Sequence, residues 1–308
     1  MAQVEDSQVK TRATLALFIA MWLWSSSFIA LKYAFASFDP FFVIWGRMAV
    51  ASLCFLLLAP WVFKGCHYQR GDWKYLIGMS LFEPCLYFIF EAMALQNTTA
   101  SQAGMITAML PVLVAAGAAF FLGERMSRQA YAGFAVALLG SVWLSLAGTP
   151  EEGAPNPILG NFFEFLAMLC ATGYVLVLKH LTKRYSSFFL TAMQAFCGTV
   201  FFLPFVLFRD AGWPTQWQSL PTFAIIYLGT MVTLGAYGLY NYGVSKVEAA
   251  KATAFINLIP VFTLILAWAL LGETLSFIQT CASALVLIGV ITSQVRLSRK
   301  AVPLVEGN

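Results

Sequence analysis

The chain has 308 residues, of which 60% are hydrophobic and only 10% are charged, and its mean hydropathy is +0.77. A soluble domain has about 45–50% apolar residues, so this composition excludes one and predicts an integral membrane protein. The formal net charge of +4 is small and gives no reason to expect a nucleic-acid partner.

Ten apolar runs are long enough to cross a hydrocarbon core of about 30 Å, which takes about 20 helical residues. Since lipid offers no partner for an unpaired backbone group, each run is expected to be a helix. The predicted fold is therefore an all-α integral membrane protein with ten transmembrane helices. In chain order the runs lie near residues 13–34, 40–63, 74–95, 103–122, 129–147, 158–180, 187–208, 222–243, 252–271 and 275–295.

The first run also has the features of a cleavable signal peptide, because Lys10 and Arg12 precede it and Ala34-Phe35-Ala36 follows it. However, it is longer than the about 7–15 apolar residues of such a peptide. Several of its positions also recur in the second half of the chain, at an offset of 147 residues, as Leu31-Lys32 does in Leu178-Lys179. The run is therefore interpreted as the first transmembrane helix.

A polar, proline-rich linker at 149–157 divides the runs into two groups of five. We expect a cytoplasmic segment at 1–12, a first five-helix repeat at 13–148, a second at 158–296 and a cytoplasmic tail at 297–308. Because five is odd, the second repeat enters the membrane from the opposite side, which makes the repeats inverted. The distribution of lysine and arginine supports this inverted orientation. The segments predicted to lie outside carry only Lys32 and Arg209, and the other basic residues between the runs lie in segments predicted to be inside. Both termini are accordingly expected on the cytoplasmic side of the cell inner membrane.

Two stretches carry the same pattern, Pro111 with Gly123-Glu124 and Pro260 with Gly272-Glu273, at an offset of 149 residues. A chain that repeats itself inside a bilayer is typical of a transporter, in which two similar halves rock around a site between them. The two prolines are expected in mid-helix, as bends that act in gating. The two glutamates are expected to complement the start of the following helix.

These units, together with Trp24-Ser25-Ser26-Ser27-Phe28, Lys32 and Arg47, resemble the ten-helix EamA-type family of the drug/metabolite transporter superfamily, over about residues 13–296. One departure is Ser25, where the family often has glycine. The resemblance implies a central cavity lined by helices 1–4 and 6–9. It also implies that helices 5 and 10 are peripheral and form a homodimer contact.

Away from their ends, the predicted spans hold four charged residues, namely Arg47, Glu83, Glu91 and Glu164. Such groups are costly in lipid and usually mark a pathway or a partner. Glu83, Tyr87 and Glu91 recur at every fourth position, so they share one helix face, which must be turned toward the protein interior. The alternative for Arg47 is a structural ion pair. The four residues are candidates for coupling or gating, because one arginine cannot satisfy three carboxylates.

Aromatic side chains inside the spans add a second group of candidates. Together with the glutamates they predict a site for an ammonium group, held by charge and cation–π attraction. Packing is the alternative for each of them. The candidate solute-binding residues are Trp24, Glu83, Tyr87, Glu91, Tyr174, Tyr237, Tyr240 and Asn257.

Comparing corresponding positions of the two halves distinguishes residues of the shared scaffold from residues of a binding site. Pro111 and Pro260 match, which is typical of architecture, whereas Glu91 corresponds to Tyr240 and Arg47 to Gln194. A site for an asymmetric solute need not match between halves.

We therefore expect a secondary transporter that exports a small metabolite, with an amino acid or organic amine as the leading solute and Glu83 or Glu91 taking up a coupling proton. A facilitative carrier or channel for a nucleoside, sugar or drug-like cation is the alternative. An enzyme is not expected, because the spans hold no aspartate, no histidine apart from His180 at the end of one run, and no catalytic constellation. The six cysteines are scattered without a C-x-x-C pair, and no motif predicts a metal or cofactor.

Overall fold

The computed structural model describes residues 2–62, 68–123, 126–182, 184–208, 213–246 and 255–294. Within these ranges the chain forms helices and no strand, apart from one isolated bridge between Glu151 and Ala154. Nine helices of the described ranges are long and apolar enough to cross a membrane. The shorter apolar helix Leu258–Leu271 occupies the place of the remaining predicted span. The predicted all-α membrane fold is confirmed.

The first half contains five spans, two of which are built from more than one helix. Its second span starts in a typical way, since the Asp39 carboxylate accepts a hydrogen bond from Phe41 N at 2.9 Å and Pro40 is the first helical residue. The elements are α1 (Ala2–Phe35), α2 (Pro40–Leu57), α3 (Ala59–Val62), α4 (Trp73–Ser80), η1 (Leu81–Leu86), α5 (Tyr87–Asn97), α6 (Ala100–Thr107), α7 (Leu110–Leu122) and α8 (Arg128–Leu146).

The second half repeats this order of elements. The predicted start of its fourth span, 252–254, lies outside the described residues. The elements are α9 (Pro157–Leu181), α10 (Ser187–Leu207), α11 (Ser219–Tyr227), η2 (Leu228–Ala236), α12 (Tyr237–Lys246), α14 (Leu258–Leu271) and α15 (Phe277–Gln294).

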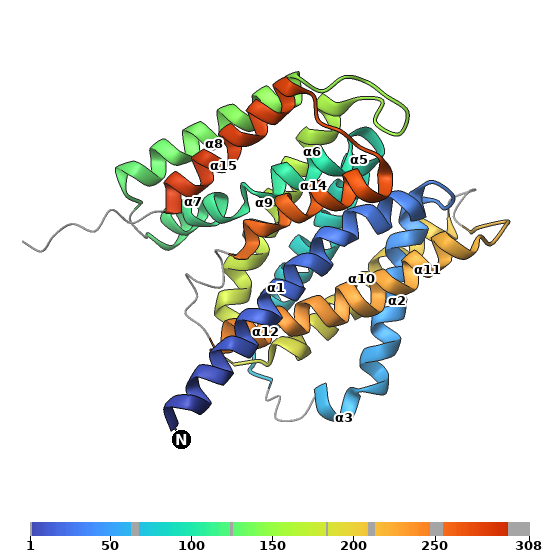
Figure 1. Ribbon diagram of the computed structural model, residues 1–308. Helices are drawn as coiled ribbons and strands as arrows, with labels where there is room; N and C mark the ends of the chain where they lie inside the picture. The colour runs from blue at the N-terminus through green and yellow to red at the C-terminus, as the bar shows by residue number, and fades with distance from the viewer. Residues whose placement is uncertain are drawn as a thin grey trace, which may run out of the picture.

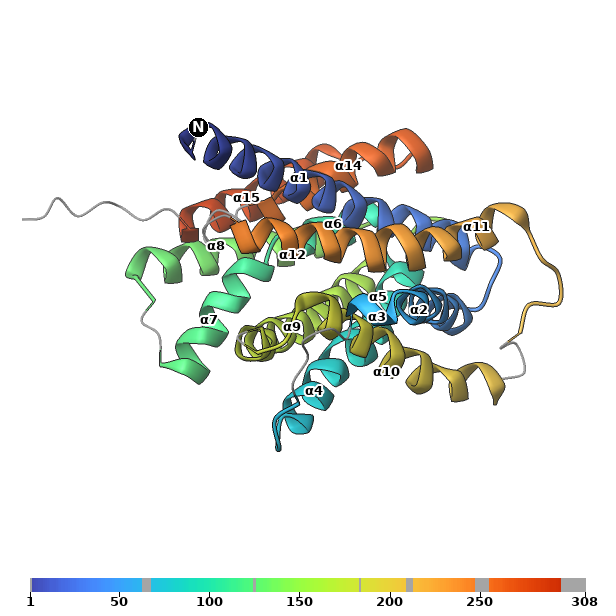
Figure 2. The same cartoon turned by 90° about the horizontal axis from the view of Figure 1, so that it is seen from below.

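The two halves interlock with an approximate twofold relation. α1 packs against α12 and α14 of the second half, and the equivalent α9 packs against α5, α6 and α7 of the first. The pairs α2 with α10 and α8 with α15 each join equivalent helices, and α6 packs against α14 of the equivalent fourth span. α8 and α15 lie side by side at one edge of the bundle, apart from α2 and α10 (Figures 1 and 2). This packing is expected of two inverted five-helix repeats.

The third span of each half widens into a π-helix in the middle, at η1 and at η2. In η1 the backbone of Glu83 departs from helical geometry, with φ −146° and ψ 118°. π-helical turns of this kind occur frequently at functional sites, because they expose backbone groups and redirect side chains. Their presence at equivalent places makes the centre of the bundle the region to search for a site.

The fourth span of each half is interrupted, which corrects the expectation of mid-helix prolines. α6 ends at Thr107 and a turn precedes α7, so Pro111 lies in the first turn of α7. Asn257 is likewise a turn residue, and Pro260 is the third residue of α14. In the first turn of a helix the missing proline N–H removes no intrahelical hydrogen bond, so these residues start helices and do not bend continuous ones.

The Gly-Glu units end helices as their sequence suggests. Gly123 and Gly272 are left-handed caps of α7 and α14, each with φ 69°, a conformation that favours glycine. Glu273 does not complement the following helix as expected. Its carboxylate accepts hydrogen bonds from Ala100 N and Ser101 N, at 2.9 and 2.8 Å, and so caps α6 of the other half. Glu124 lies outside the described residues.

Candidate functional site

A cavity of about 160 Å³ lies at the seam between the two halves. Seven of the eight predicted solute-binding residues line it, as does Arg47, so the structure brings most of these candidates together. Further lining residues come from both halves and are mostly apolar. The cavity is lined by Trp24, Ser27, Phe28, Arg47, Glu83, Tyr87, Phe88, Glu91, Thr107, Leu110, Met168, Ala171, Tyr174, Val175, Leu178, Tyr237, Tyr240, Ile256 and Ile259.

Many of the lining positions correspond between the halves, although their side chains differ. Leu110 and Ile259, at an offset of 149 residues, precede the two prolines and both face the cavity. The same offset relates other lining pairs of unlike chemistry, Phe88 with Tyr237 and Glu91 with Tyr240. The approximate twofold axis therefore passes through a cavity whose shape is repeated and whose polar groups are not.

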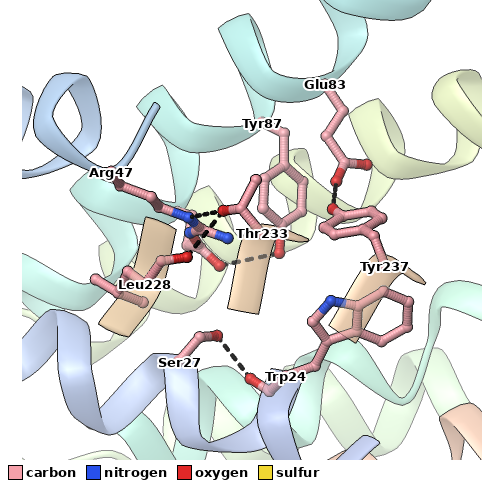
Figure 3. A network of polar contacts seen from close by, with 9 residues as sticks. Trp24, Ser27, Arg47, Glu83, Tyr87, Leu228, Thr233 and Tyr237 are labelled. Atoms are coloured by element: carbon pink, nitrogen blue, oxygen red, sulfur yellow. Dashed lines mark hydrogen bonds and ion pairs between the residues drawn. The ribbon is translucent and has the colours of Figure 1, made fainter. Parts of the chain in front are cut away.

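One wall of the cavity carries the only arginine of the predicted spans. Arg47 on α2 is 4% exposed, and its Nε donates a hydrogen bond to Thr233 Oγ1 at 2.9 Å (Figure 3). Its guanidinium lies 4.4 Å from the centre of the Phe88 ring, a cation–π contact. Glu91 Oε2 is 4.0 Å from Nη1, and Glu91 Oε1 accepts a hydrogen bond from Tyr87 Oη at 3.0 Å. At 4.0 Å the Arg47–Glu91 pair is an ion pair without a direct hydrogen bond.

The other polar wall is formed by Glu83, whose carboxylate accepts a hydrogen bond from Tyr237 Oη (Figure 3). Gln194 on α10 donates to the Glu83 carbonyl oxygen at 2.8 Å. That carbonyl lies in η1, where the helical pattern is broken. Gln194 and Arg47 occupy equivalent positions, and each reaches the π-helical segment of the opposite half, η1 and η2 respectively. The two contacts tie the halves together at the level of the cavity.

Aromatic rings close the space between these polar walls. The Trp24 ring packs against Tyr237 and Tyr240, with ring centres 5.1 and 5.0 Å apart. Tyr174 on α9 is also buried in the lining. Aromatic faces near a carboxylate offer both cation–π attraction and charge to an ammonium group.

The remaining predicted site residues lie outside the lining. Asn257 Nδ2 donates to Gln294 Oε1 on α15 at 3.1 Å. Pro111 and Pro260 each follow a lining residue by one position. Glu164 is 0% exposed and is buried behind the cavity wall, one helical turn from the lining residue Met168.

A cluster of hydrogen bonds joins the halves at the end of the bundle opposite the N-terminus, which we call the distal end. Lys32 Nζ donates to the carbonyl oxygens of Thr98 and Gly153 at 2.6 and 2.8 Å. Thr98 Oγ1 donates to Asn161 Oδ1, and Asn161 Nδ2 donates to Gln102 Oε1, both at 2.8 Å. With the Glu273 cap of α6, these residues form the distal polar cluster, defined as Lys32, Thr98, Gln102, Asn161 and Glu273. These hydrogen bonds hold the two halves together at the distal end.

At the opposite end, Asp72 connects the start of the third span to the loop after α9. It is 4% exposed and accepts hydrogen bonds from Arg184 Nη1 at 2.8 Å and from Tyr185 Oη at 3.0 Å. Burial, with the neighbouring Asp72 carboxylate, raises the pKa of the Tyr185 hydroxyl above its usual value. Tyr185 therefore remains a hydrogen-bond donor across the physiological pH range.

Three residues that contact the predicted site residues were not expected from the sequence. Thr233 accepts the Arg47 hydrogen bond, Phe88 packs under the guanidinium and Gln194 holds the kinked backbone of Glu83. A signal existed for Gln194, since it corresponds to Arg47 in the repeat. Thr233 and Phe88 gave no signal, because threonine and phenylalanine are ordinary residues of an apolar span.

Comparison with known proteins agrees with this architecture. The sequence pattern described as "EamA-like transporter family" matches twice, over residues 11–146 and 158–293. The chain belongs to the EamA-like transporter family. It is thus a member of the drug/metabolite transporter superfamily, as its sequence suggested.

Curated relatives of the EamA-like chain are similar over nearly their whole length. An uncharacterized transporter of Archaeoglobus fulgidus is 27% identical, over 92% of this chain and 97% of the relative. The uncharacterized transporter YcxC of Bacillus subtilis is 27% identical, over 94% and 95% respectively. A probable terminal-alkyne amino-acid exporter of Streptantibioticus cattleyicolor is 26% identical, over 91% and 93%.

A solved crystal structure superposes with a TM-score of 0.63, at 21% identity, over 92% of this chain and 96% of that one. At this identity the likeness concerns the fold alone. The named relatives are transporters and not enzymes, so this EamA-like protein is a multi-pass membrane transporter.

Proposed function

We propose that this protein is a secondary active transporter that exports an amino acid or an organic amine by alternating exposure of its central cavity. The observation that carries the proposal is a carboxylate and a guanidinium on different walls of one small aromatic cavity. Its volume of about 160 Å³ is below the about 300–1,000 Å³ of pockets for drug-sized ligands, which favours a small metabolite.

In the proposed complex the solute's ammonium group meets Glu83 and the faces of Trp24 and Tyr240. Its carboxylate, where the solute has one, meets Arg47. The guanidinium is suited to this, since among the described residues its hydrogen bond runs through Nε, and Glu91 approaches Nη1 only to 4.0 Å. The terminal nitrogens thus retain donors for a planar carboxylate.

Alternating access follows from the repeat. The interrupted fourth spans of the two halves meet at the cavity. One consists of α6 with α7 and the other of α14 with the turn before it. Rocking one half against the other therefore exposes the cavity to either side. Pro111 and Pro260 define the interruptions and are the proposed gating elements, and the buried carboxylates of the spans supply coupling to protons. The exporter named among the relatives supports an amino-acid solute and the outward direction.

A second candidate is a facilitative carrier or channel for a drug-like cation, a nucleoside or a sugar. The Arg47–Glu91 pair favours the cation, because it leaves Glu83 as the unbalanced charge in the cavity.

The deciding experiment is transport by purified protein in proteoliposomes, with radiolabelled L-amino acids, organic amines, nucleosides and sugars. We expect saturable countertransport of at least one amino acid or amine. Glu83→Gln should weaken its binding by about 1.5–3 kcal/mol, roughly 10- to 150-fold, because the carboxylate charge is lost. Glu152→Gln, in the exposed linker, is the matched control and should behave as wild type. Flux that is non-saturable, or restricted to nucleosides or sugars, contradicts the proposal.

We further propose that the protein resides in the inner membrane with both termini in the cytoplasm, so that the distal end faces outward, and that it forms a homodimer through α8 and α15. Labelling of single cysteines placed at residue 2 and residue 213 of a cysteine-free variant tests the orientation, since residue 2 should react only from the cytoplasmic side. Cross-linking in native membranes through cysteines on α15 tests the dimer, and a monomeric pattern there contradicts it.

A further inference from the structure

The cavity region holds three buried glutamates but one arginine, and their surroundings differ. Glu91 is the partner of Arg47 and also accepts the Tyr87 hydrogen bond, as an ionised carboxylate does. Glu83 faces the cavity and accepts from Tyr237. Among the described residues of the cavity region, Glu164 therefore has no positively charged side chain as a partner.

Glu164 lies in the second turn of α9 and is completely buried. Neither of its carboxyl oxygens has a hydrogen-bond partner among the described residues. Lacking a place in the cavity lining, it has no access to a solute in this conformation.

Charged and titratable groups on the helices packed against α9 do not compensate a charge on Glu164. α6 and α7 contribute none, and the groups of α4 and α8 are at the far ends of those helices. The nearer elements that pack against α9 contribute Glu91 and Tyr87 on α5, with Glu83 and Cys85 on η1. The distant groups are Lys74, Tyr75, Arg128 and Tyr131.

An ionised carboxylate cannot be buried without a counter-charge or hydrogen bonds, because the desolvation cost is far larger than for the neutral acid. Glu91 lies within electrostatic range of Glu164, so a second negative charge would also be repelled. In this conformation Glu164 therefore holds a proton.

A chain of polar groups leads from the level of Glu164 to the distal surface. Asn161 is nearly one turn earlier on α9 and is hydrogen-bonded to Gln102 and Thr98. The Thr98 carbonyl in turn accepts from Lys32 at the distal end. These groups line a polar route from the distal end toward the α9 face that carries Glu164.

We propose that Glu164 is a proton-binding site of the carrier, separate from the solute cavity, which exchanges its proton with water at the distal side when the distal polar cluster opens. On exchange the carboxyl O–H bond breaks, the proton passes to water and the carboxylate remains. The carboxylate then repels Glu91, the partner of Arg47, which links the proton to the guanidinium that meets the solute. This inference rests on the proposed transport function and assigns its coupling site to Glu164.

The first test needs no solute. Infrared spectra of the purified protein at neutral pH should contain the C=O stretching band of a protonated buried carboxylic acid. Glu164→Gln should lose this band, whereas Glu83→Gln, the same change at a hydrogen-bonded glutamate, should keep it. A Glu164→Gln protein that is folded by its thermal transition and keeps the full band overturns the proposal.

The second test measures coupling. Proteoliposomes that contain a pH-sensitive dye are given a mixture of L-amino acids, and proton movement is recorded together with radiolabel exchange. We expect Glu164→Gln to exchange label while losing the proton signal of the wild type. Wild-type proton movement in the variant overturns the proposal. If no amino acid or amine moves even in wild type, the proposed function fails, and the infrared band still decides whether Glu164 holds a proton.

Discussion

At the scale of single residues, several polar groups inside this bundle form their hydrogen bonds with residues of the opposite half. Arg47 is a ligand candidate and a cross-half tie at once, because its Nε is used by Thr233 while its terminal nitrogens face the cavity. Arg47 can therefore form a structural ion pair and also contact a solute, so the two interpretations of this residue are compatible. The loose 4.0 Å approach of Glu91 accounts for this, since it neutralises the charge without occupying every donor.

Thr233→Val tests the hydrogen bond between Arg47 and Thr233, which joins the two halves. The substitution keeps the shape of the side chain and removes the acceptor of the Arg47 Nε hydrogen bond, which leaves a buried donor unpaired. We expect a loss of about 1–3 kcal/mol in stability, seen as a lower thermal transition of the detergent-solubilised protein. Thr230→Val, in the same π-helical segment but with a half-buried side chain that donates only to the Ile226 carbonyl one turn earlier, should change little. Equal transitions in the two variants would refute the role of the tie.

At the scale of elements, glycine sets how closely the two peripheral helices approach. A Cβ on Gly289 of α15 would lie 2.3 Å from the backbone nitrogen of Ala137 on α8. A Cβ on Gly133 of α8 would lie 2.4 Å from the backbone nitrogen of Ser293. Small residues allow such close packing of helices in lipid, where hydrophobic burial gives no driving force.

Gly289→Ala should therefore separate α8 from α15. The added methyl group meets backbone, which cannot turn away as a side chain does, so we expect a loss of about 1–3 kcal/mol or more in thermal or denaturant unfolding. Gly78→Ala is the matched control, because nothing lies within 4 Å of its Cβ position. It should be neutral or stabilising by up to about 1 kcal/mol, from helix propensity. A Gly289→Ala protein as stable as Gly78→Ala would contradict the packing argument.

At the scale of the whole molecule, the distal polar cluster holds the halves together in the conformation described. Glu273 caps a helix of the other half with two backbone hydrogen bonds, so the same carboxylate has to leave α6 when the distal side opens. A charged acceptor at a helix N-terminus also interacts favourably with the helix dipole, so its strength affects the balance between the two conformations.

Glu273→Gln should shift that balance. The amide loses the charge and one of the two acceptor oxygens, which weakens the cap by about 1 kcal/mol and raises the population of the distally open form about fivefold. The measurement is the labelling rate of a cysteine at residue 27, in a variant whose native cysteines are replaced, by an impermeant reagent added from the distal side. Glu152→Gln should leave the rate unchanged. A slower or equal rate in Glu273→Gln would refute the role of the cap.

Much of the molecule was predictable from sequence, because the bilayer leaves few choices. Runs such as 129–147 and 187–208 must be helices, and the matched Gly-Glu units revealed the repeat before any coordinates. The interior position of Glu83 followed from its place on one helix face with Tyr87 and Glu91, since a carboxylate cannot face lipid. The exact repeat boundaries given above stay predictions.

The sequence by itself determined the membrane class, the duplicated five-helix plan and the family, because hydropathy, charge and internal offset are properties of the chain. Only the tertiary structure decided that Glu91 rather than Glu164 meets Arg47, that Glu273 caps α6, and that Asn257 contacts Gln294 outside the cavity. Each of these joins residues distant in the chain, and the Glu273 cap also crosses from one repeat to the other. The partner of a buried polar group depends on which helix packs against it. The neighbouring residues in the sequence do not determine this packing.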